Sequence, residues 1–142
     1  YSGDEIGQVN DYAYKEDPDK APDSRYIHRG KFCWDLTERI KAGSSVQGRI
    51  FAGLEELEKI RRTEAVFGAD AEVYTKDYND NSILWIVRRA GDEELHAVFN
   101  FSDEGRTIWM PEKAQYTNLV TGVTQETETV ELSGWDFVWM KR

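Results

Sequence analysis

The part of the sequence after residue 70 consists of short segments rich in β-branched and aromatic residues, separated by turn-rich pieces. The segments are AEVYT, ILWIVRR, LHAVFNF, RTIWM, YTNLV, ETVEL and DFVWMK, and the pieces between them are DYNDNS, AGDEE, SDEG, PEKA, TGVTQE and SGW. Strands of this length, with a break about every ten residues, are typical of antiparallel sandwiches. The pattern therefore predicts an antiparallel β-sandwich.

One amphipathic helix is predicted before the strands, over residues 45–65. Ser44 is a favourable N-cap, and Gln47 stands three residues later, as in a capping box. Gly68 lies shortly past the end and is expected to terminate the helix. Apolar residues recur along one side at helical spacing: Val46, Ile50, Phe51, Leu54, Leu57 and Ile60. We expect this apolar stripe to pack against other protein surface.

Residues 1–43 show neither the helical period of 3.6 residues nor the strand period of two residues. We therefore predict a long loop there, with one helical turn over residues 35–41.

The net charge of −9 disfavours nucleic acid and anionic membranes as partners, because like charges repel. No stretch approaches the roughly 18 apolar residues that a membrane span needs. The one cysteine, Cys33, rules out an internal disulfide and fits a reducing compartment, so we expect a cytoplasmic location.

Motifs for metal or cofactor chemistry are absent from the sequence. Its two histidines, His28 and His96, are too few for a histidine-rich metal site. His96 falls inside a strand segment, where a core or surface position is expected. The sequence has no nucleophile elbow, no phosphate-cradling glycine loop and no paired cysteines. We therefore expect no cofactor and no metal site.

A polar group in the first loop is a candidate for sugar binding. Asp23, Ser24 and Arg25 are consecutive, and His28 and Arg29 follow closely. An arginine can fork onto a carboxylate, or onto sugar hydroxyls, with fixed geometry. A loop dense in such residues suits a polar sugar pocket, and a solvated loop is the alternative.

The tryptophans are a second candidate for sugar binding, because an exposed ring can stack on a sugar. Trp85 and Trp139 lie in apolar strand segments, and we expect them to be packed in the core. Trp109 and Trp135 lie nearer to turns, so either role stays open for them.

Taken in order, these pieces resemble glycoside hydrolase family 13. The segment GDEIGQVNDYAYKEDPDKAPDSRYIHR, residues 3–29, is similar to the loop after the eighth barrel strand. It is most similar to the amylosucrase-like branch, where the pattern runs GDE-G, NDY, DP-KA, DSR and HR. VFNFSD, residues 98–103, resembles the NFS motif of the C-terminal β-sandwich called domain C, and DFVWMK resembles its closing strand. The resemblance covers essentially the whole chain.

This resemblance implies a mostly β fold, in which a long loop and the last helix of a (β/α)8 barrel, residues 1–69, precede domain C, residues 70–142. It also implies the C-terminal part of a retaining α-glucosyl-transferring or hydrolysing enzyme that acts on sucrose or α-glucans. In that family the nucleophile, the acid/base and the transition-state-stabilising carboxylate come from earlier strands. We therefore expect no catalytic residue in this chain and no activity from it alone.

The same resemblance implies which residues bind substrate. Barrel enzymes build their active sites from the loops at the strand C-terminal ends. In amylosucrases the arginine of the DSR motif lies at the pocket floor, paired with an upstream aspartate, and Arg25 is the matching position. Asp23, His28 and Arg29 are the other substrate-binding candidates. Gly30 stands where amylosucrases commonly carry proline, which leaves the exact substrate open.

Two other functions stay open. A stand-alone carbohydrate-binding sandwich would need an exposed aromatic platform, with Trp109 and Trp135 on one face. A purely structural sandwich would need no such aromatic platform. The expected partners are sucrose or an α-glucan for the parent protein, and a second copy of the fragment, bound through surface that would face the barrel.

Overall fold

The computed structural model describes residues 3–41 and 43–142. The chain divides into two compact units, Tyr1–Glu58 and Lys59–Arg142, here called the N-terminal unit and the C-terminal unit. Helix α2 (Val46–Thr63) contributes to both, because the boundary falls within it. The predicted division after residue 69 marks the end of a barrel, a different criterion, and it stays a prediction.

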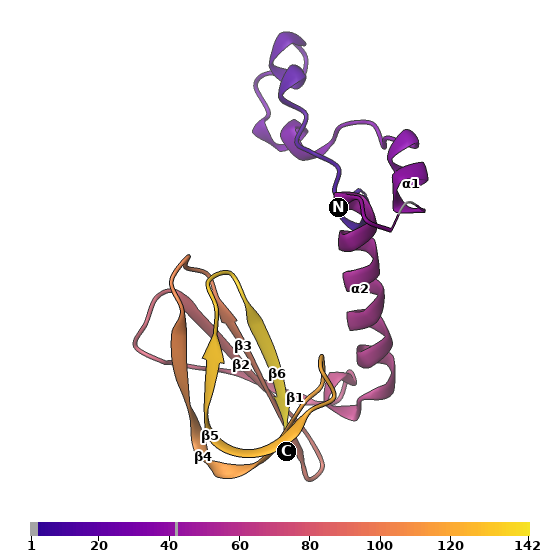
Figure 1. Ribbon diagram of the computed structural model, residues 1–142. Coiled ribbons are helices and arrows are strands. Elements are labelled where there is room, and N and C mark those ends of the chain that lie inside the picture. The colour runs from indigo at the N-terminus through magenta and orange to yellow at the C-terminus, as the bar shows by residue number, and fades with distance from the viewer. Residues whose placement is uncertain (1–2, 42) are drawn as a thin grey trace. The chain divides into compact units, whose positions relative to one another are not determined.

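Short helical turns make up the N-terminal unit (Figure 1). They are η1 (Asp4–Ile6), η2 (Tyr12–Glu16), η3 (Ser24–His28) and α1 (Asp35–Ile40), followed by the first part of α2. Aspartates begin η2 and η3: the Asp11 carboxylate accepts the Ala13 backbone N–H, and that of Asp23 accepts the Arg25 backbone N–H, each at 3.0 Å. Such bonds fix a turn from its own sequence. Helix α1 confirms the helical turn expected over residues 35–41.

Helix α2 begins one residue later than predicted. The Ser45 hydroxyl, rather than that of Ser44, accepts the Gly48 backbone N–H at 2.9 Å, so Ser45 is the N-cap. A 3₁₀ turn, η4 (Ala65–Phe67), follows α2. Gly68 closes this turn by donating its backbone N–H to the Ala65 carbonyl at 2.8 Å, and it does not end α2 itself.

The apolar stripe of α2 is only partly covered, contrary to expectation. Val46 and Leu54 leave 55% and 42% of their surface exposed. Ile50 is half-buried because it packs at Gly7, where a Cβ would lie 2.8 Å from the Ile50 Cδ1 atom. The described residues of the N-terminal unit therefore do not bury the stripe.

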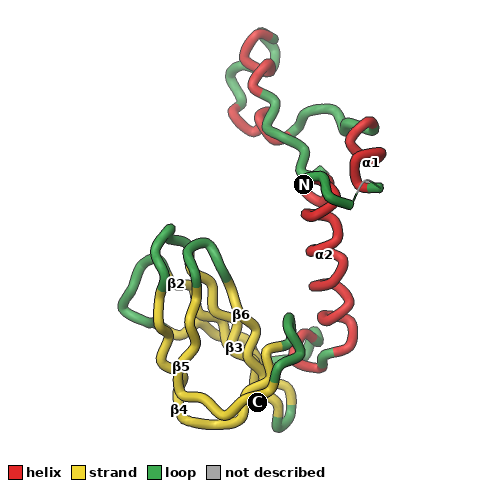
Figure 2. Tube along the Cα trace, in the orientation of Figure 1, coloured by secondary structure: helices red, strands yellow, loops and turns green. Residues whose placement is uncertain are grey.

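An antiparallel sheet of six strands makes up most of the C-terminal unit, after the end of α2 and η4 (Figure 2). The strands are β1 (Glu72–Lys76), β2 (Ile83–Ala90), β3 (Glu93–Asn100), β4 (Arg106–Asn118), β5 (Thr124–Leu132) and β6 (Phe137–Lys141). Their order in the sheet is β1-β2-β3-β6-β4-β5. Strand β6 pairs with β4 at only two positions, Lys141 with Thr117 and Met140 with Asn118. The sheet turns at this short junction.

The hydrophobic core lies between the two parts of this folded sheet. Its buried members are Trp85, Val87, Val98, Ile108, Met110, Tyr116, Leu132, Val138 and Met140. They come from β2 through β6, and their side chains interdigitate as in sandwich packing. The predicted antiparallel β-sandwich, preceded by a helix and a long loop segment, is confirmed. Trp85 and Trp139, which we expected in the core, are 1% and 7% exposed.

One predicted turn is wrong. The PEKA piece, residues 111–114, lies inside strand β4. The register of β4 against β5 shifts between Trp109 and Ala114. Pro111 has no backbone N–H to donate, and an irregular stretch of strand tolerates this. The RTIWM and YTNLV segments therefore form one irregular strand instead of two strands joined by a turn.

The NFS motif joins two turns at one end of the sandwich. Asn100, only 2% exposed, donates its side-chain N–H groups to the Glu104 carbonyl at 2.7 Å and to the Ser133 carbonyl at 2.9 Å. Its Oδ1 atom accepts the Ser102 hydroxyl at 2.8 Å. One side chain thus connects the β3–β4 turn with the β5–β6 turn.

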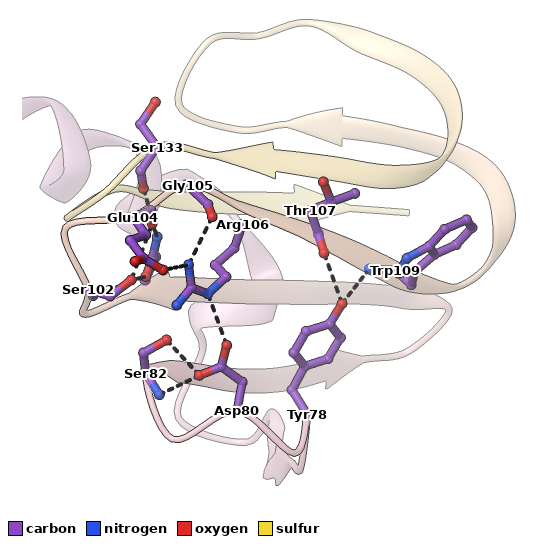
Figure 3. A network of polar contacts seen from close by, with 11 residues as sticks. Tyr78, Asp80, Ser82, Ser102, Glu104, Gly105, Arg106, Thr107, Trp109 and Ser133 are labelled. Atoms are coloured by element: carbon purple, nitrogen blue, oxygen red, sulfur yellow. Dashed lines mark hydrogen bonds and ion pairs between the residues drawn. The ribbon is translucent and has the colours of Figure 1, made fainter.

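The β1–β2 loop is fastened to one edge of β4 (Figure 3). The Tyr78 hydroxyl donates to the Thr107 carbonyl and accepts the Trp109 backbone N–H, each at 3.0 Å. Arg106 donates through Nε to the Asp80 carboxylate at 3.0 Å. Strand β4 pairs with β5 along its other edge. The bonds from the β1–β2 loop therefore occupy polar groups on the edge of β4 that β5 does not cover.

Candidate functional site

Asp23 and Arg25, the central pair of the predicted site, bind each other at the start of η3. The Arg25 Nε atom donates to Asp23 Oδ1 at 2.8 Å, and Arg25 NH2 donates to Asp23 Oδ2 at 2.7 Å. This two-point contact lowers the pKa of Asp23 to about 2, because the Arg25 guanidinium stabilises the charged carboxylate. The Arg25 side chain is 70% exposed, so the pair presents a fixed, open polar surface.

His28 and Arg29 take different partners in the same loop. The His28 Nδ1 atom lies 3.1 Å from Asn10 Oδ1, which connects the HR motif with the NDY motif. The Arg29 guanidinium lies over the ring of Tyr26, 5.6 Å from its centroid. Cationic and aromatic groups in this arrangement attract one another and stiffen the loop.

Arg29 lines a hollow of about 400 Å³ together with Asp11, Tyr14, Lys20, Tyr26 and Lys31. His28 lines a separate space of about 40 Å³, and Asp23 and Arg25 line neither of the two. The four predicted residues therefore share one loop but not one hollow. Sequence reasoning missed Tyr14 and Tyr26, whose signal was their place between the NDY and HR motifs.

The described residues offer no group of three or more histidine, cysteine or carboxylate side chains placed to hold a metal ion. Likewise, none of the described helices has both the length and the apolar character to cross a membrane.

Trp109 and Trp135 are both exposed, at 60% and 70%. Trp109 lies on β4, three residues after Arg106, and Arg106 pairs with Leu132 at the C-terminal end of β5. Trp135 lies three residues after Leu132, in the β5–β6 turn, where its backbone N–H donates to the Ser102 carbonyl at 2.8 Å. The two rings thus come from different elements and do not sit side by side on one strand pair.

A buried ionisable group occupies the interior of the C-terminal unit. His96, 1% exposed, accepts the Trp85 indole N–H on Nδ1 at 3.2 Å, so its proton resides on Nε2. Nε2 lies 2.9 Å from Glu94 Oε1, off the direction of a well-formed hydrogen bond. Burial lowers the pKa of His96 to about 4, although Glu94 opposes the shift. Arg89 and Arg142 also contact the Glu94 carboxylate.

No protein-family model matches the chain, but solved structures match its fold. Cyclic α-maltosyl-(1→6)-maltose hydrolase from Arthrobacter globiformis matches over 99% of this chain and 26% of its own, with a TM-score of 0.64 and 20% identity. Trehalulose synthase MutB from Pseudomonas mesoacidophila matches over 78% and 21%, with a TM-score of 0.60 and 18% identity. A variant of isomaltulose synthase from Erwinia rhapontici, in complex with its natural substrate sucrose, matches over 65% and 17%, with a TM-score of 0.57 and 20% identity.

These neighbours are enzymes of glycoside hydrolase family 13. The chain spans between 17% and 26% of the length of these three proteins. At such identities the likeness establishes the fold: both the helical turns and the sandwich of this chain have counterparts in the hydrolase, since the match covers 99% of its residues. The chain therefore has the fold of the matched part of these enzymes.

Proposed function

We propose that the chain is the C-terminal part of a retaining enzyme of glycoside hydrolase family 13, related to the amylosucrases, that transfers or hydrolyses α-glucosyl units of sucrose or α-glucans. The observation that carries the proposal is the loop of residues 3–30. It has the ordered motifs of the family's pocket loop, and it surrounds an open hollow with two tyrosines and Arg29. A fold alone does not define a function, so the loop supplies the argument.

The residues around this hollow can hydrogen-bond sugar hydroxyls. Tyr14 and Tyr26 contribute hydroxyl groups and Asp11 an acceptor, while the cations that line the hollow, Lys20, Arg29 and Lys31, contribute donors. The Asp23–Arg25 pair does not line this hollow and supplies a separate fixed polar surface of the same loop. In the intact enzyme we place Arg25 at the floor of the glucosyl pocket, facing a carboxylate from an earlier barrel strand.

The catalytic carboxylates belong to the rest of the parent protein in this proposal. A retaining mechanism needs a nucleophile and an acid/base about 5 Å apart, which together form and then break a glucosyl–enzyme bond. The loop described here contributes the walls that orient the sugar ring, because orientation alone lowers the barrier of such a reaction. A cytoplasmic location and a homodimer of the fragment remain further predictions.

The first test compares the pure 142-residue chain with the complete protein on sucrose. The complete protein should release fructose, and the chain alone should release none at any concentration. Release of fructose that scales with the amount of pure chain would contradict the proposal, and so would a complete protein without activity on sucrose or α-glucans.

The products of the complete protein separate the relatives. The glucosyl–enzyme intermediate can pass its sugar to a glucan, to water or back to fructose, which gives a polymer, glucose or a sucrose isomer. We propose the first outcome, because the motif order is closest to the amylosucrase-like branch. Gly30, in place of the proline common in that branch, is the departure that makes this product analysis informative.

A carbohydrate-binding module is the second candidate function, favoured by the exposure of Trp109 and Trp135. The two rings belong to different elements, so a shared platform would have to be built from strand β4 and the β5–β6 turn together. Retention of the chain on insoluble starch, abolished by Trp109→Ala and Trp135→Ala together, would support this function over the first.

A further inference from the structure

The sheet of the C-terminal unit has two end strands, β1 and β5, and each pairs with a neighbouring strand along one edge only. Strand β2 pairs with β1 over residues 72–76. Among the described residues, no hydrogen bond reaches the backbone of β1 from any element other than β2. The other edge of β1 therefore presents unpaired backbone N–H and C=O groups, which are a template for a further strand.

Strand β5 is protected from such pairing by its charge. It carries three carboxylates, Glu126, Glu128 and Glu131, and no cation. Among the described side chains, only Glu126 of these three contacts a cation, that of Lys113 at 2.9 Å. A second β5 laid along this edge would bring carboxylates close together, and like charges across a strand pair are destabilising. The edge of β5 therefore disfavours a second copy of the chain.

Strand β1, with the sequence EVYTK, instead carries one charge of each sign at its two ends. Glu72 begins the strand and Lys76 ends it, and neither forms an ion pair with another described residue. Between them, Val73 and Tyr74 are 54% and 40% exposed. The register against β2 is continuous over all five residues, so the edge has neither the proline nor the bulge that protects other edge strands.

We propose that β1 pairs antiparallel with β1 of a second copy of this chain, which joins the two sheets edge to edge. When Tyr74 lies opposite Tyr74 of the second copy, the two-fold axis sets Glu72 opposite Lys76 at both ends of the pair. Each end then gains a contact between opposite charges, and the centre gains a pair of aromatic rings. A register centred on Val73 or Thr75 would set one charge opposite Tyr74 instead, so the charges select the register.

The occupant of this edge is a second copy because the charge pattern of β1 is complementary to itself only when the strand is reversed. The interface differs from the barrel-facing surface through which the sequence predicts a homodimer. It does not depend on the proposed function, because none of its residues lies in the loop of residues 3–30.

Self-association of the 142-residue chain is the first test. Sedimentation equilibrium from about 10 µM to 1 mM covers the dissociation constants expected of an interface of only five residues a strand. A monomer–dimer equilibrium within this range is expected. A chain that stays monomeric throughout would overturn the proposal.

Charge reversals at the two ends of β1 place the interface. Glu72→Lys sets two cations opposite each other at both ends of the pair, and Lys76→Glu sets two carboxylates there. Each variant should weaken self-association about tenfold or more, because two attractive cross-strand pairs become repulsive. An equimolar mixture of the two variants should recover the association, since each end then joins a cation to a carboxylate. A mixture that associates no better than either variant alone would overturn the proposal, and recovery also shows that both variants fold.

Glu128→Lys is the matched control, because it makes the same change in net charge as Glu72→Lys on the other end strand. Glu128 is exposed, so the fold should persist. This variant should self-associate at least as well as the unaltered chain does. Equal weakening by Glu128→Lys and Glu72→Lys would assign the effect to net charge and would overturn the assignment to β1.

Amide hydrogen exchange of the unaltered chain gives a readout that needs no variant. When the concentration rises from about 10 µM to 1 mM, the amides of β1 should exchange more slowly, because pairing protects them. The amides of β5 should exchange at the same rate at both concentrations. Slower exchange confined to β5 or to helix α2 would place the contact elsewhere and would overturn the proposal.

Discussion

The two units differ in the sequence distance that the central polar contact of each spans. In the N-terminal unit, Asp23 bonds Arg25, two residues further on, although longer contacts such as Gln8 with Cys33 also occur there. In the C-terminal unit, Asn100 bonds the carbonyl of Ser133, which lies 33 residues away. Long-range bonds of this kind form only when the chain has folded, whereas a local turn forms from its own sequence. The sandwich therefore specifies its own tertiary structure, and the loop offers preformed turns suited to line a pocket.

The largest effect is expected when the central long-range contact is removed. Asn100→Ala removes the bonds to the Glu104 and Ser133 carbonyls and to the Ser102 hydroxyl, all of which are partly buried. We expect the free energy of unfolding of the C-terminal unit to fall by about 3 kcal/mol, since each of the three lost hydrogen bonds contributes about 1 kcal/mol. Urea unfolding followed by tryptophan fluorescence measures this.

Asn81→Ala is the matched control for Asn100→Ala. Asn81 is exposed in the β1–β2 loop, and surface substitutions usually change stability by less than about 0.5 kcal/mol. A small effect of Asn100→Ala, close to that of the control, would show that the two turns do not depend on each other.

The second effect is a pH dependence confined to the C-terminal unit. The pKa of buried His96 is lowered to about 4, so the unfolded chain binds a proton that the folded unit does not. The stabilisation is complete above pH 6.5 and is lost as the pH falls toward 4. Between pH 6.5 and 4.5 we expect a loss of about 2–3 kcal/mol, at 1.36 kcal/mol per pH unit. Urea unfolding across this range measures the slope.

The other histidine provides the control for this slope. His28 lies in the N-terminal unit, so His28→Asn should leave the pH dependence of the C-terminal unit unchanged. His96→Gln should flatten it at some cost in stability, since a carboxamide can still meet the Trp85 indole N–H. A slope that persists in His96→Gln would assign the pH dependence to other groups.

A smaller effect distinguishes packed from open positions on helix α2. Gly53 has open space where a Cβ would lie, so Gly53→Ala should stabilise the helix by about 0.5–1 kcal/mol. At Gly48 a Cβ would lie 3.0 Å from the Gly43 carbonyl oxygen. Gly48→Ala should therefore gain none of this. Thermal unfolding followed by circular dichroism at 222 nm compares them, and equal gains would show that the N-terminal unit does not close on α2 at Gly48.

The smallest stability effect is expected at Arg25. Its side chain is 70% exposed and contacts a carboxylate two residues away, and such pairs contribute little to stability. Arg25→Ala should change the melting of the 142-residue chain by less than about 0.5 kcal/mol. A large loss would show that Arg25 serves the fold of this segment.

Periodicity was sufficient to predict the helix and most strands, because period 3.6 and period 2 report local backbone geometry. Prediction from periodicity failed where the same residue type fits two positions or two kinds of structure equally well. Ser44 and Ser45 are equally good caps, and Pro111 suits an irregular strand as well as a turn. The hollow at Tyr14 and the free edge of β1 could not be predicted, because they depend on how loops meet and how strands are ordered in space.

The central claim is that the loop of residues 3–30 lines a glucosyl pocket in a complete enzyme. The most direct test is the kcat/KM for sucrose of the complete protein with Arg25→Ala, beside Arg25→Lys. We expect Arg25→Ala to lower kcat/KM about a hundredfold or more, because a pocket carboxylate would lose its two-point partner. Arg25→Lys should recover only part of this, since an ammonium cannot form the fork. Near-normal sucrose turnover by Arg25→Ala would contradict the account.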